Sequence, residues 1–151
     1  MERIRPPLTC SLPPLVDADR AGLDEIYAGL ESNHRRAGAS CRACGACCRL
    51  AEWGHELRVT PLELALFADR HVLRSPTVYD VCPYLAGDGR CAARAGRPLG
   101  CRAFHCSLPA LQMEDAHARA FHDLRVLHEK RGIPFEQGDW LATLDYLSIS
   151  C

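Results

Sequence analysis

Cysteine is the residue type in this chain whose number and spacing point most directly to chemistry. The stretch CRACGACC, residues 41–48, contains four thiols in the pattern C-x2-C-x2-C-C. If this stretch is helical, at about 100° per residue, all four thiols lie within an arc of about 120° on one face. Four unpaired thiols so close together would be prone to oxidation unless something binds them. Three explanations compete at this point: a disulfide framework, a metal or iron–sulfur site, and a redox-active thiol centre.

A second group of cysteines follows in a Pro- and Gly-rich segment, residues 75–110, which lacks sustained periodicity. About 35 residues without regular elements are unusual inside a compact domain and need something to organise them. The tripeptide GDG, residues 87–89, is typical of a turn, and it predicts a short hairpin that brings Cys82 and Cys91 towards each other. The cysteines of the two segments form one set: Cys41, Cys44, Cys47, Cys48, Cys82, Cys91, Cys101 and Cys106.

Adjacent cysteines restrict how these thiols can be shared. Cys47 and Cys48 cannot easily reach the same tetrahedral ion, and a disulfide between neighbours would be strained, so at least one of them should face the later cysteines. Four plus four thiols suffice for two sites of four cysteines each or for one multinuclear centre. Cys41-x2-Cys44 is a zinc knuckle, but the longer run also begins like a bacterial ferredoxin motif, whose last cysteine precedes a proline as Cys82 does. The spacing favours a metal site without choosing between zinc, iron and an iron–sulfur cluster.

The order of short motifs adds a resemblance to a known family. CRACGACC, TPLE, CPYL, GRC, RPLGCR and FHC occur in the order seen in the YkgJ-type CxxCxxCC cysteine-cluster family, a zinc- or iron-chelating domain, and the similarity runs from about residue 41 to residue 106. A similar cysteine pattern occurs in flagellin N-methylases, in which an iron–sulfur centre is implicated. The chain departs from its relatives at ARAG, residues 93–96, where an aromatic residue usually precedes the RP pair. The resemblance implies that the metal ligands are Cys41, Cys44, Cys47, Cys48, Cys82, Cys91, Cys101 and Cys106.

Arginines near the cysteines are candidates for a supporting role. Several thiolates around one ion or cluster leave an excess of negative charge, which guanidinium groups can offset by hydrogen bonds to sulfur. Arg97 and Arg102, which belong to the family's signature, are the candidate cofactor-binding residues, and Arg42 and Arg49 are further candidates of the same kind.

Other chemistry-bearing residues give weaker signals. His55 and His105 lie close to cysteines, but with eight thiols available neither is needed as a ligand. Glu114 and His117 have the spacing of one half of a di-iron motif, which requires two copies. The chain has no Ser–His–Asp order, phosphate-binding Gly loop or dinucleotide fingerprint. Whether it catalyses a reaction therefore stays open, and a non-enzymatic role is favoured.

Length and composition place further bounds on function. A chain of 151 residues is expected to form one domain. Its net charge of −1, with Lys130 as the only lysine, gives no sign of a nucleic-acid or membrane partner. With no targeting signal or membrane-spanning stretch, we expect a cytoplasmic, reducing environment, where dense cysteines indicate metal binding or catalysis more often than disulfides. The expected partners are a metal ion and, for a redox role, a redox or enzyme partner protein.

Helical signals precede and follow the first cysteine stretch. Asp17 or Asp19 can cap a first helix, which ends before RRAGAS, residues 35–40. TPLE, residues 60–63, combines a capping box with a proline at the first helical position, and it predicts a helix through residues 62–71.

Two more helices are expected after the second cysteine segment. The pattern over residues 110–131 predicts a long helix that ends at Gly132 and Pro134. Asp139 can cap a last helix, and residues 55–60 alternate weakly, as in a short strand. One face of the long helix is expected to include Leu111, Phe121, Leu124, Leu127 and His128.

The sequence thus predicts a mainly α fold: a small helical domain around an irregular, metal-organised, cysteine-rich centre, with at most a short hairpin. We expect residues 1–151 to form this single domain, with an extended lead-in over residues 1–16. Residues 41–106 form the metal-binding core of this prediction and residues 110–151 the C-terminal helices.

Overall fold

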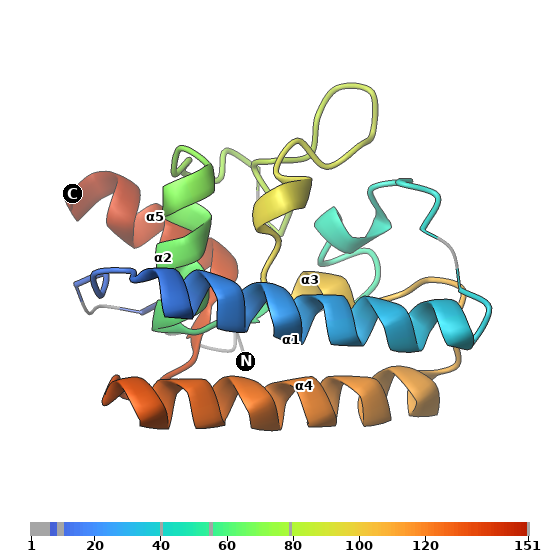
Figure 1. Ribbon diagram of the computed structural model, residues 1–151. Coiled ribbons are helices and arrows are strands. Elements are labelled where there is room, and N and C mark those ends of the chain that lie inside the picture. Colours follow the sequence, from blue (N-terminus) through green and yellow to red (C-terminus); the bar gives the residue numbers. More distant parts are fainter. Residues whose placement is uncertain (1–6, 9–10, 40, 55, 79, 151) are drawn as a thin grey trace, which may run out of the picture.

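The structure, a computed structural model, describes residues 7–8, 11–39, 41–54, 56–78 and 80–150. Within these ranges it is mainly α-helical, as predicted, and its sheet consists of one antiparallel pair of two-residue strands (Figure 1). The elements in chain order are α1 (Asp17–Arg36), the 3-10 helix η1 (Ala46–Cys48), β1 (Arg58–Val59), α2 (Pro61–Arg70), the 3-10 helix η2 (Arg94–Gly96), α3 (Leu99–Ala103), α4 (Ala110–Arg131), β2 (Gly138–Asp139) and α5 (Trp140–Ser150).

The two long helices, α1 and α4, lie side by side and antiparallel (Figure 1). The buried stripe of α4 contains Ala116, Ala120, Leu124 and His128, spaced four residues apart, and the two alanines allow close approach. Leu111 was expected on this stripe but is 76% exposed, because it lies on the opposite side of the helix from Ala120. No helix within the described ranges combines the length and the apolar composition needed to span a bilayer.

The capping box of α2 does more than start a helix. Glu63 is 2% exposed, and its carboxylate accepts hydrogen bonds from the Thr60 backbone N–H (3.1 Å) and the Thr60 hydroxyl (3.0 Å), as predicted. It also accepts from the Leu99 backbone N–H at the start of α3 (2.6 Å) and from the Tyr27 hydroxyl on α1 (3.3 Å). One carboxylate therefore joins three helices, even though burial raises its pKa.

The C-terminal helix is anchored through the small sheet. Arg58 pairs with Asp139 between β1 and β2, and the Trp140 backbone N–H donates to the Leu57 carbonyl (3.0 Å). The Asp139 carboxylate accepts from the Ala142 N–H (3.0 Å), which confirms the predicted cap of α5. These contacts place Trp140 at the centre of the molecule, where it is 1% exposed.

The buried apolar side chains form two clusters. One joins α1, α3 and α4 with one face of α2 and includes Leu23, Leu66 and Leu124. The other joins α2 and α5 with the cysteine segments, and Cys48 and Cys82 belong to it. The second cluster is the one that positions thiols.

Residues 41–48 do not form the helix that would present four thiols on one face. Only Ala46–Cys48 are helical, as a single 3-10 turn. Ala43, between Cys41 and Cys44, and Gly45, directly after Cys44, have positive φ values of 53° and 73°, and these interrupt the helical path. A side chain at Gly45 would also overlap with the Gly89 carbonyl, because the GDG turn packs directly against it.

The GDG turn closes the predicted contact between the Cys82 and Cys91 segments. Leu85 and Cys91 form an antiparallel bridge, and the Ala86 N–H donates to the Arg90 carbonyl (2.8 Å). Residues 75–110 are less irregular than predicted, because they contain η2 and α3.

Candidate metal centre

The cysteines of the described residues are all free, and they separate into two groups. We call the first the inner thiol set; its members line one small pocket and are Cys47, Cys48, Cys82, Cys91 and Cys101. We call the second the outer thiol set; its members are exposed and are Cys41, Cys44 and Cys106. Thiols from the first cysteine stretch and from the later segment therefore meet in both sets.

Cys48 is the hub of the inner thiol set. Its thiol lies in the same pocket as those of Cys47, Cys82 and Cys91 and interacts with all three. The backbone fixes part of this arrangement, because the Cys82 N–H donates to the Cys48 carbonyl (2.9 Å). Cys101 joins from α3. Segments far apart in the sequence thus bring five sulfur atoms to one place.

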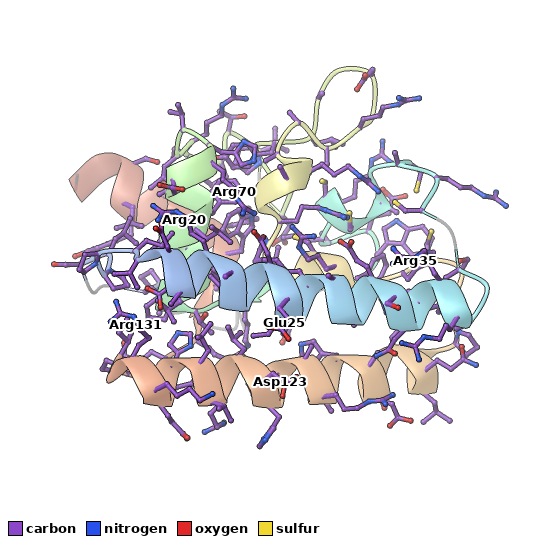
Figure 2. All side chains as sticks on the ribbon, in the orientation of Figure 1. Arg20, Glu25, Arg35, Arg70, Asp123 and Arg131 are labelled. Carbon is purple, nitrogen blue, oxygen red and sulfur yellow. The ribbon has the colours of Figure 1, made fainter. Side chains whose placement is uncertain are left out.

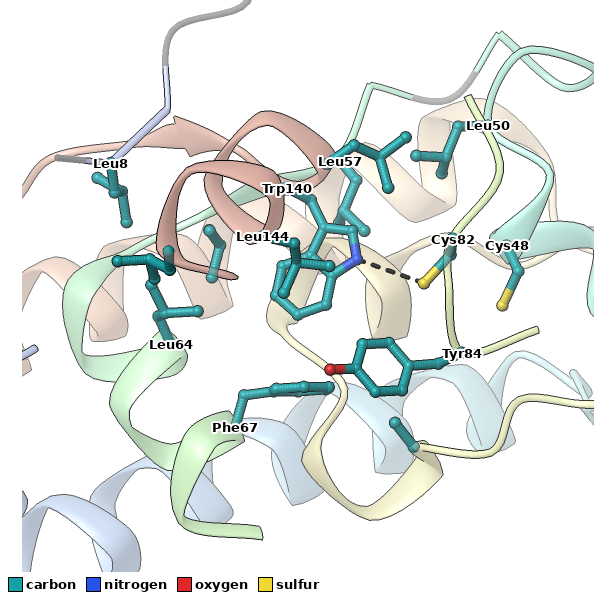
Figure 3. Packing of buried hydrophobic residues seen from close by; sticks show 14 residues of the cluster. Leu8, Cys48, Leu50, Leu57, Leu64, Phe67, Cys82, Tyr84, Trp140 and Leu144 are labelled. Carbon is teal, nitrogen blue, oxygen red and sulfur yellow. Dashed lines mark hydrogen bonds between the residues drawn. The ribbon is translucent and has the colours of Figure 1, made fainter. Parts of the chain in front are cut away.

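Aromatic side chains surround one side of the inner thiol set. The Trp140 indole N–H donates to the Cys82 sulfur (3.4 Å). The rings of Phe67 and Tyr84 lie next to the Trp140 ring (Figure 3). The centroid of the Phe67 ring lies 4.9 Å from both the Trp140 ring and the Tyr84 ring. These rings give the site an apolar wall beside Cys82, which is 7% exposed.

Hydrogen bonding among the thiols divides their protons unequally. Hydrogen bonding with Cys48 lowers the pKa of Cys47 to about 6 and, when Cys91 is the acceptor, that of Cys91 to about 6, and the nearby Arg97 charge acts in the same direction. The hydrogen bonds with Cys47, Cys82 and Cys91 raise the pKa of Cys48, so Cys48 retains its proton. Burial raises the pKa of Cys101 well above its ordinary value.

The outer thiol set has a different environment. Cys106 is hydrogen-bonded to Cys44, and loss of solvent together with this neighbour raises the pKa of Cys106. Burial would raise the pKa of Cys41, but its hydrogen bonds to the Arg94 side chain and to the Ala43 backbone N–H (3.4 Å) outweigh burial and lower it. No aromatic ring within the described residues donates to these sulfur atoms.

A groove of about 870 Å³ opens beside the outer thiol set. One of its walls is α1, and the opposite wall is the cysteine stretch; sulfur atoms gather above the C-terminal half of α1, on the side where Arg35 is labelled (Figure 2). Two members of the inner set, Cys47 and Cys91, also line the groove, so it connects the two sets. Its charged lining consists of Asp24, Glu31, Arg35, Arg42, Arg70, Arg94, Arg97 and Arg102.

The two predicted cofactor-binding arginines have different surroundings. The charge of Arg97 acts to lower the pKa of Cys47, Cys91 and Cys101, and its guanidinium is 3.8 Å from the Glu31 carboxylate. Arg102 instead donates to Glu31 (2.6 Å) and to the Arg97 carbonyl (2.6 Å), with its guanidinium 4.1 Å above the Tyr27 ring. The contacts of Arg102 attach α3 to α1.

Sequence reasoning missed two groups that contact sulfur directly. Arg94 lies in the ARAG stretch, the place where the chain departs from its relatives, and the departure was the only signal. Trp140 lies 58 residues beyond Cys82 in the sequence, and no local pattern connects the two.

The histidines near the cysteines are not arranged as obvious ligands. His105 Nδ1 is occupied by the Ser107 hydroxyl (2.8 Å). His34, on α1, packs edge to face against the His105 ring at 5.6 Å, and its Nε2 is buried without a hydrogen-bond partner in the described part of the chain. His55 lies outside the described residues.

These thiols have the chemistry that a metal site needs, but their side chains are not arranged around one ion. Across the described ranges, no three His, Cys, Asp or Glu side chains stand in position to hold one metal ion together. The donors nevertheless have the right chemistry, because clustered thiols, some with lowered pKa, suit zinc, iron and iron–sulfur clusters.

Comparison with known proteins decides the family. A family model described as "CxxCxxCC: Putative zinc- or iron-chelating domain" matches residues 40–125, more than half of the chain. The chain belongs to the CxxCxxCC family. All members of the inner and outer thiol sets fall within the matched part of this CxxCxxCC domain. No curated protein and no solved structure matches the chain.

Proposed function

We propose that this CxxCxxCC domain binds zinc or iron through its thiols and that the inner thiol set holds a resident metal centre. The observation that carries the proposal is the position of Cys48, which contacts Cys47, Cys82 and Cys91 in a pocket walled by Trp140. Outside a disulfide-forming environment, a buried group of free thiols from separate segments is the arrangement expected of a metal site.

The members of the inner thiol set suggest how one ion would be held. Five thiols exceed the four that tetrahedral coordination uses. Because adjacent cysteines cannot easily reach the same ion, Cys48 is the better ligand of its pair: it already contacts Cys82 and Cys91. Together with Cys101, these three make a site of four cysteines. Arg97 would offset the negative charge of the thiolates.

A metal in this place would stabilise the fold as well as provide chemistry. Zinc supplies a crosslink and iron supplies one-electron chemistry, particularly as a cluster with sulfide. The segments carrying Cys48, Cys82 and Cys101 are far apart in the sequence, so the crosslink would hold them together at the centre of the molecule. Structural zinc contributes on the order of 10 kcal/mol of apparent folding free energy in small domains.

Two alternative functions use the same thiols. An iron–sulfur redox or accessory protein is favoured by the hydrogen bond from Trp140 to the Cys82 sulfur and by Arg97, since both kinds of contact tune reduction potentials. A metal-free thiol–disulfide switch is favoured by the direct contacts of Cys48 with its thiol neighbours. These alternatives differ from the first proposal in colour, sulfide content and reversible oxidation.

Metal analysis under anaerobic conditions separates the three functions. We expect the purified protein to contain zinc or iron in stoichiometric amount and Cys48→Ser to lose it, whereas Cys10→Ser retains it. Iron with acid-labile sulfide and broad absorbance near roughly 400 nm would select the iron–sulfur protein. A folded, fully reduced protein that binds neither metal would contradict metal binding and leave the thiol switch.

A further inference from the structure

The two thiol sets differ in access, and this difference bears on how metal enters and leaves; the inference rests on the proposed function. Cys48 and Cys82 are 4% and 7% exposed, whereas the outer thiol set lies on the surface. Metal sites that exchange or react keep a coordination position open to solvent, and sites that stabilise a fold are closed. The outer set offers three thiols, one fewer than a closed tetrahedral site needs.

The groove beside the outer thiol set has the size of a small-molecule site. Its volume of about 870 Å³ falls in the range of ligand pockets, roughly 300–1,000 Å³. The outer thiols line it together with Cys47 and Cys91 of the inner set. A molecule in the groove would therefore lie against the outer thiols and beside Cys47 and Cys91, the two inner thiols that the groove reaches.

The charge of the groove selects the kind of molecule. Six arginines and two carboxylates line it, although the whole chain carries a net charge of −1. Arg70 and Arg102 are paired with Asp24 and Glu31. Arg35 and Arg42 are exposed and, in the part of the chain that the structure describes, have no carboxylate partner.

Arginine is the side chain best suited to recognising carboxylates, because its planar guanidinium can donate two parallel hydrogen bonds. A cationic or uncharged metal complex would gain nothing from Arg35 and Arg42. An anionic complex would be attracted over several ångströms, and such steering raises association rates by about tenfold or more. The groove thus fits a negatively charged complex of a metal ion with oxygen donors.

We propose that the outer thiol set is the exchange site of the domain, and that it receives metal from, and returns metal to, an anionic oxygen-donor chelate bound in the arginine-lined groove. In the forward step each thiol of the set loses its proton, forms one metal–sulfur bond and displaces one carboxylate oxygen of the chelate. The thiol proton passes to the freed carboxylate or to water, and the metal keeps its oxidation state. The reverse step returns the ion to the chelate.

The test is a loading experiment with the full chain in reduced form. Cadmium is supplied either as its anionic nitrilotriacetate complex or as its cationic diethylenetriamine complex, and thiolate-to-cadmium charge-transfer absorbance is followed by stopped flow. We expect a fast phase and a slow phase from the nitrilotriacetate complex. Cys44→Ser and Cys106→Ser should each remove the fast phase and keep the slow one, and their circular dichroism checks that they fold.

The arginines provide the second arm. The double variant Arg35→Gln, Arg42→Gln should slow the fast phase about tenfold with the anionic complex and leave loading from the cationic complex unchanged or faster. Arg119→Gln, on α4 and away from the groove, is the matched control and should change neither rate.

Each of the following results would overturn the proposal, and the last would also contradict the proposed function. A fast phase that survives in both cysteine variants removes the outer set from the exchange route. Equal slowing of both complexes by the arginine variant, or no slowing, removes the anionic chelate. If the wild-type chain takes up no cadmium in either phase, the proposed function and the exchange site both fail. The results named before it contradict the exchange site alone, so the two failures can be told apart.

Discussion

The inner and outer thiol sets each take two cysteines from the same short motif, residues 41–48, and yet have different surroundings. Cys44 lies exposed in the outer set and Cys48, four residues later, is 4% exposed in the inner set. Gly45 stands between them with a positive φ, and the chain turns there instead of continuing as a helix. Apolar side chains cover Cys48 and Cys82 of the inner set, whereas the outer set faces a groove lined by charged groups. A cysteine motif therefore does not define one site; the contacts around each sulfur decide its role.

The largest expected effect separates the two sets by their contribution to stability. Cys82→Ser should lower the free energy of unfolding of the metal-loaded protein by several kcal/mol, because it removes a ligand of the proposed resident centre. Cys106→Ser should cost about 1 kcal/mol or less, because its side chain is exposed. Chemical denaturation with and without added zinc measures both. Equal losses in the two variants would abolish the distinction between a resident site and an exchange site.

Gly45 tests the turn that divides the sets. Gly45→Ala should lower the free energy of unfolding by about 3 kcal/mol or more, because the residue has a φ of 73° and its new Cβ would overlap with the Gly89 carbonyl. Gly38 has a φ of 80° with open space around it, so Gly38→Ala should cost only about 1 kcal/mol. Thermal unfolding followed by circular dichroism gives the difference. Similar values for both variants would mean that the turn does not pack on the GDG loop.

Alkylation of the metal-free, reduced protein should reverse the order expected from exposure. At pH 7, Cys47 and Cys91 should react with iodoacetamide about tenfold faster than Cys106, because their pKa of about 6 leaves them mostly as thiolate while that of Cys106 is raised. Their rates should fall as the pH drops through about 6, where the thiolates gain protons. Peptide mass spectrometry assigns each rate. Fastest labelling of Cys106 throughout would contradict the hydrogen-bonded arrangement around Cys48.

The smallest expected effect concerns the aromatic wall of the inner set. Trp140→Phe should keep most of the packing on Phe67 but lose the hydrogen bond to the Cys82 sulfur, at a cost of about 1 kcal/mol in stability or metal affinity. Trp53→Phe is the matched control, since Trp53 is 50% exposed and has no sulfur partner in the described residues. Competition with a chelator of known affinity measures the change. An unchanged affinity would remove Trp140 from the metal centre.

Local signals were enough to predict most of the helices. The capping residues of TPLE start α2 at Pro61, and Gly132 ends α4 after Arg131 as expected. These signals act within one turn of helix, so a single sequence contains them. Leu111 shows where this fails: its residue type suggested burial, but its position on the opposite side of α4 from Ala120 turns it to solvent.

The grouping of the cysteines was harder to predict because it depends on tertiary contacts. The split between the two sets is made by the turn at Gly45, and the need for a glycine there comes from Gly89, distant in sequence. Trp140 contacts sulfur from a segment whose local pattern carries no such information, and for Arg94 the departure at ARAG is the only signal. Cysteine spacing identified the chemistry, whereas long-range packing decided which thiols are neighbours.

Cadmium-113 NMR of the fully loaded protein is the most direct test of the two-set account. We expect separate resonances from a cadmium ion in the inner thiol set and one in the outer set, and addition of nitrilotriacetate should abolish the outer resonance while the inner one remains. A single resonance, or resonances that disappear together, would show that the thiols act as one site and would contradict the account.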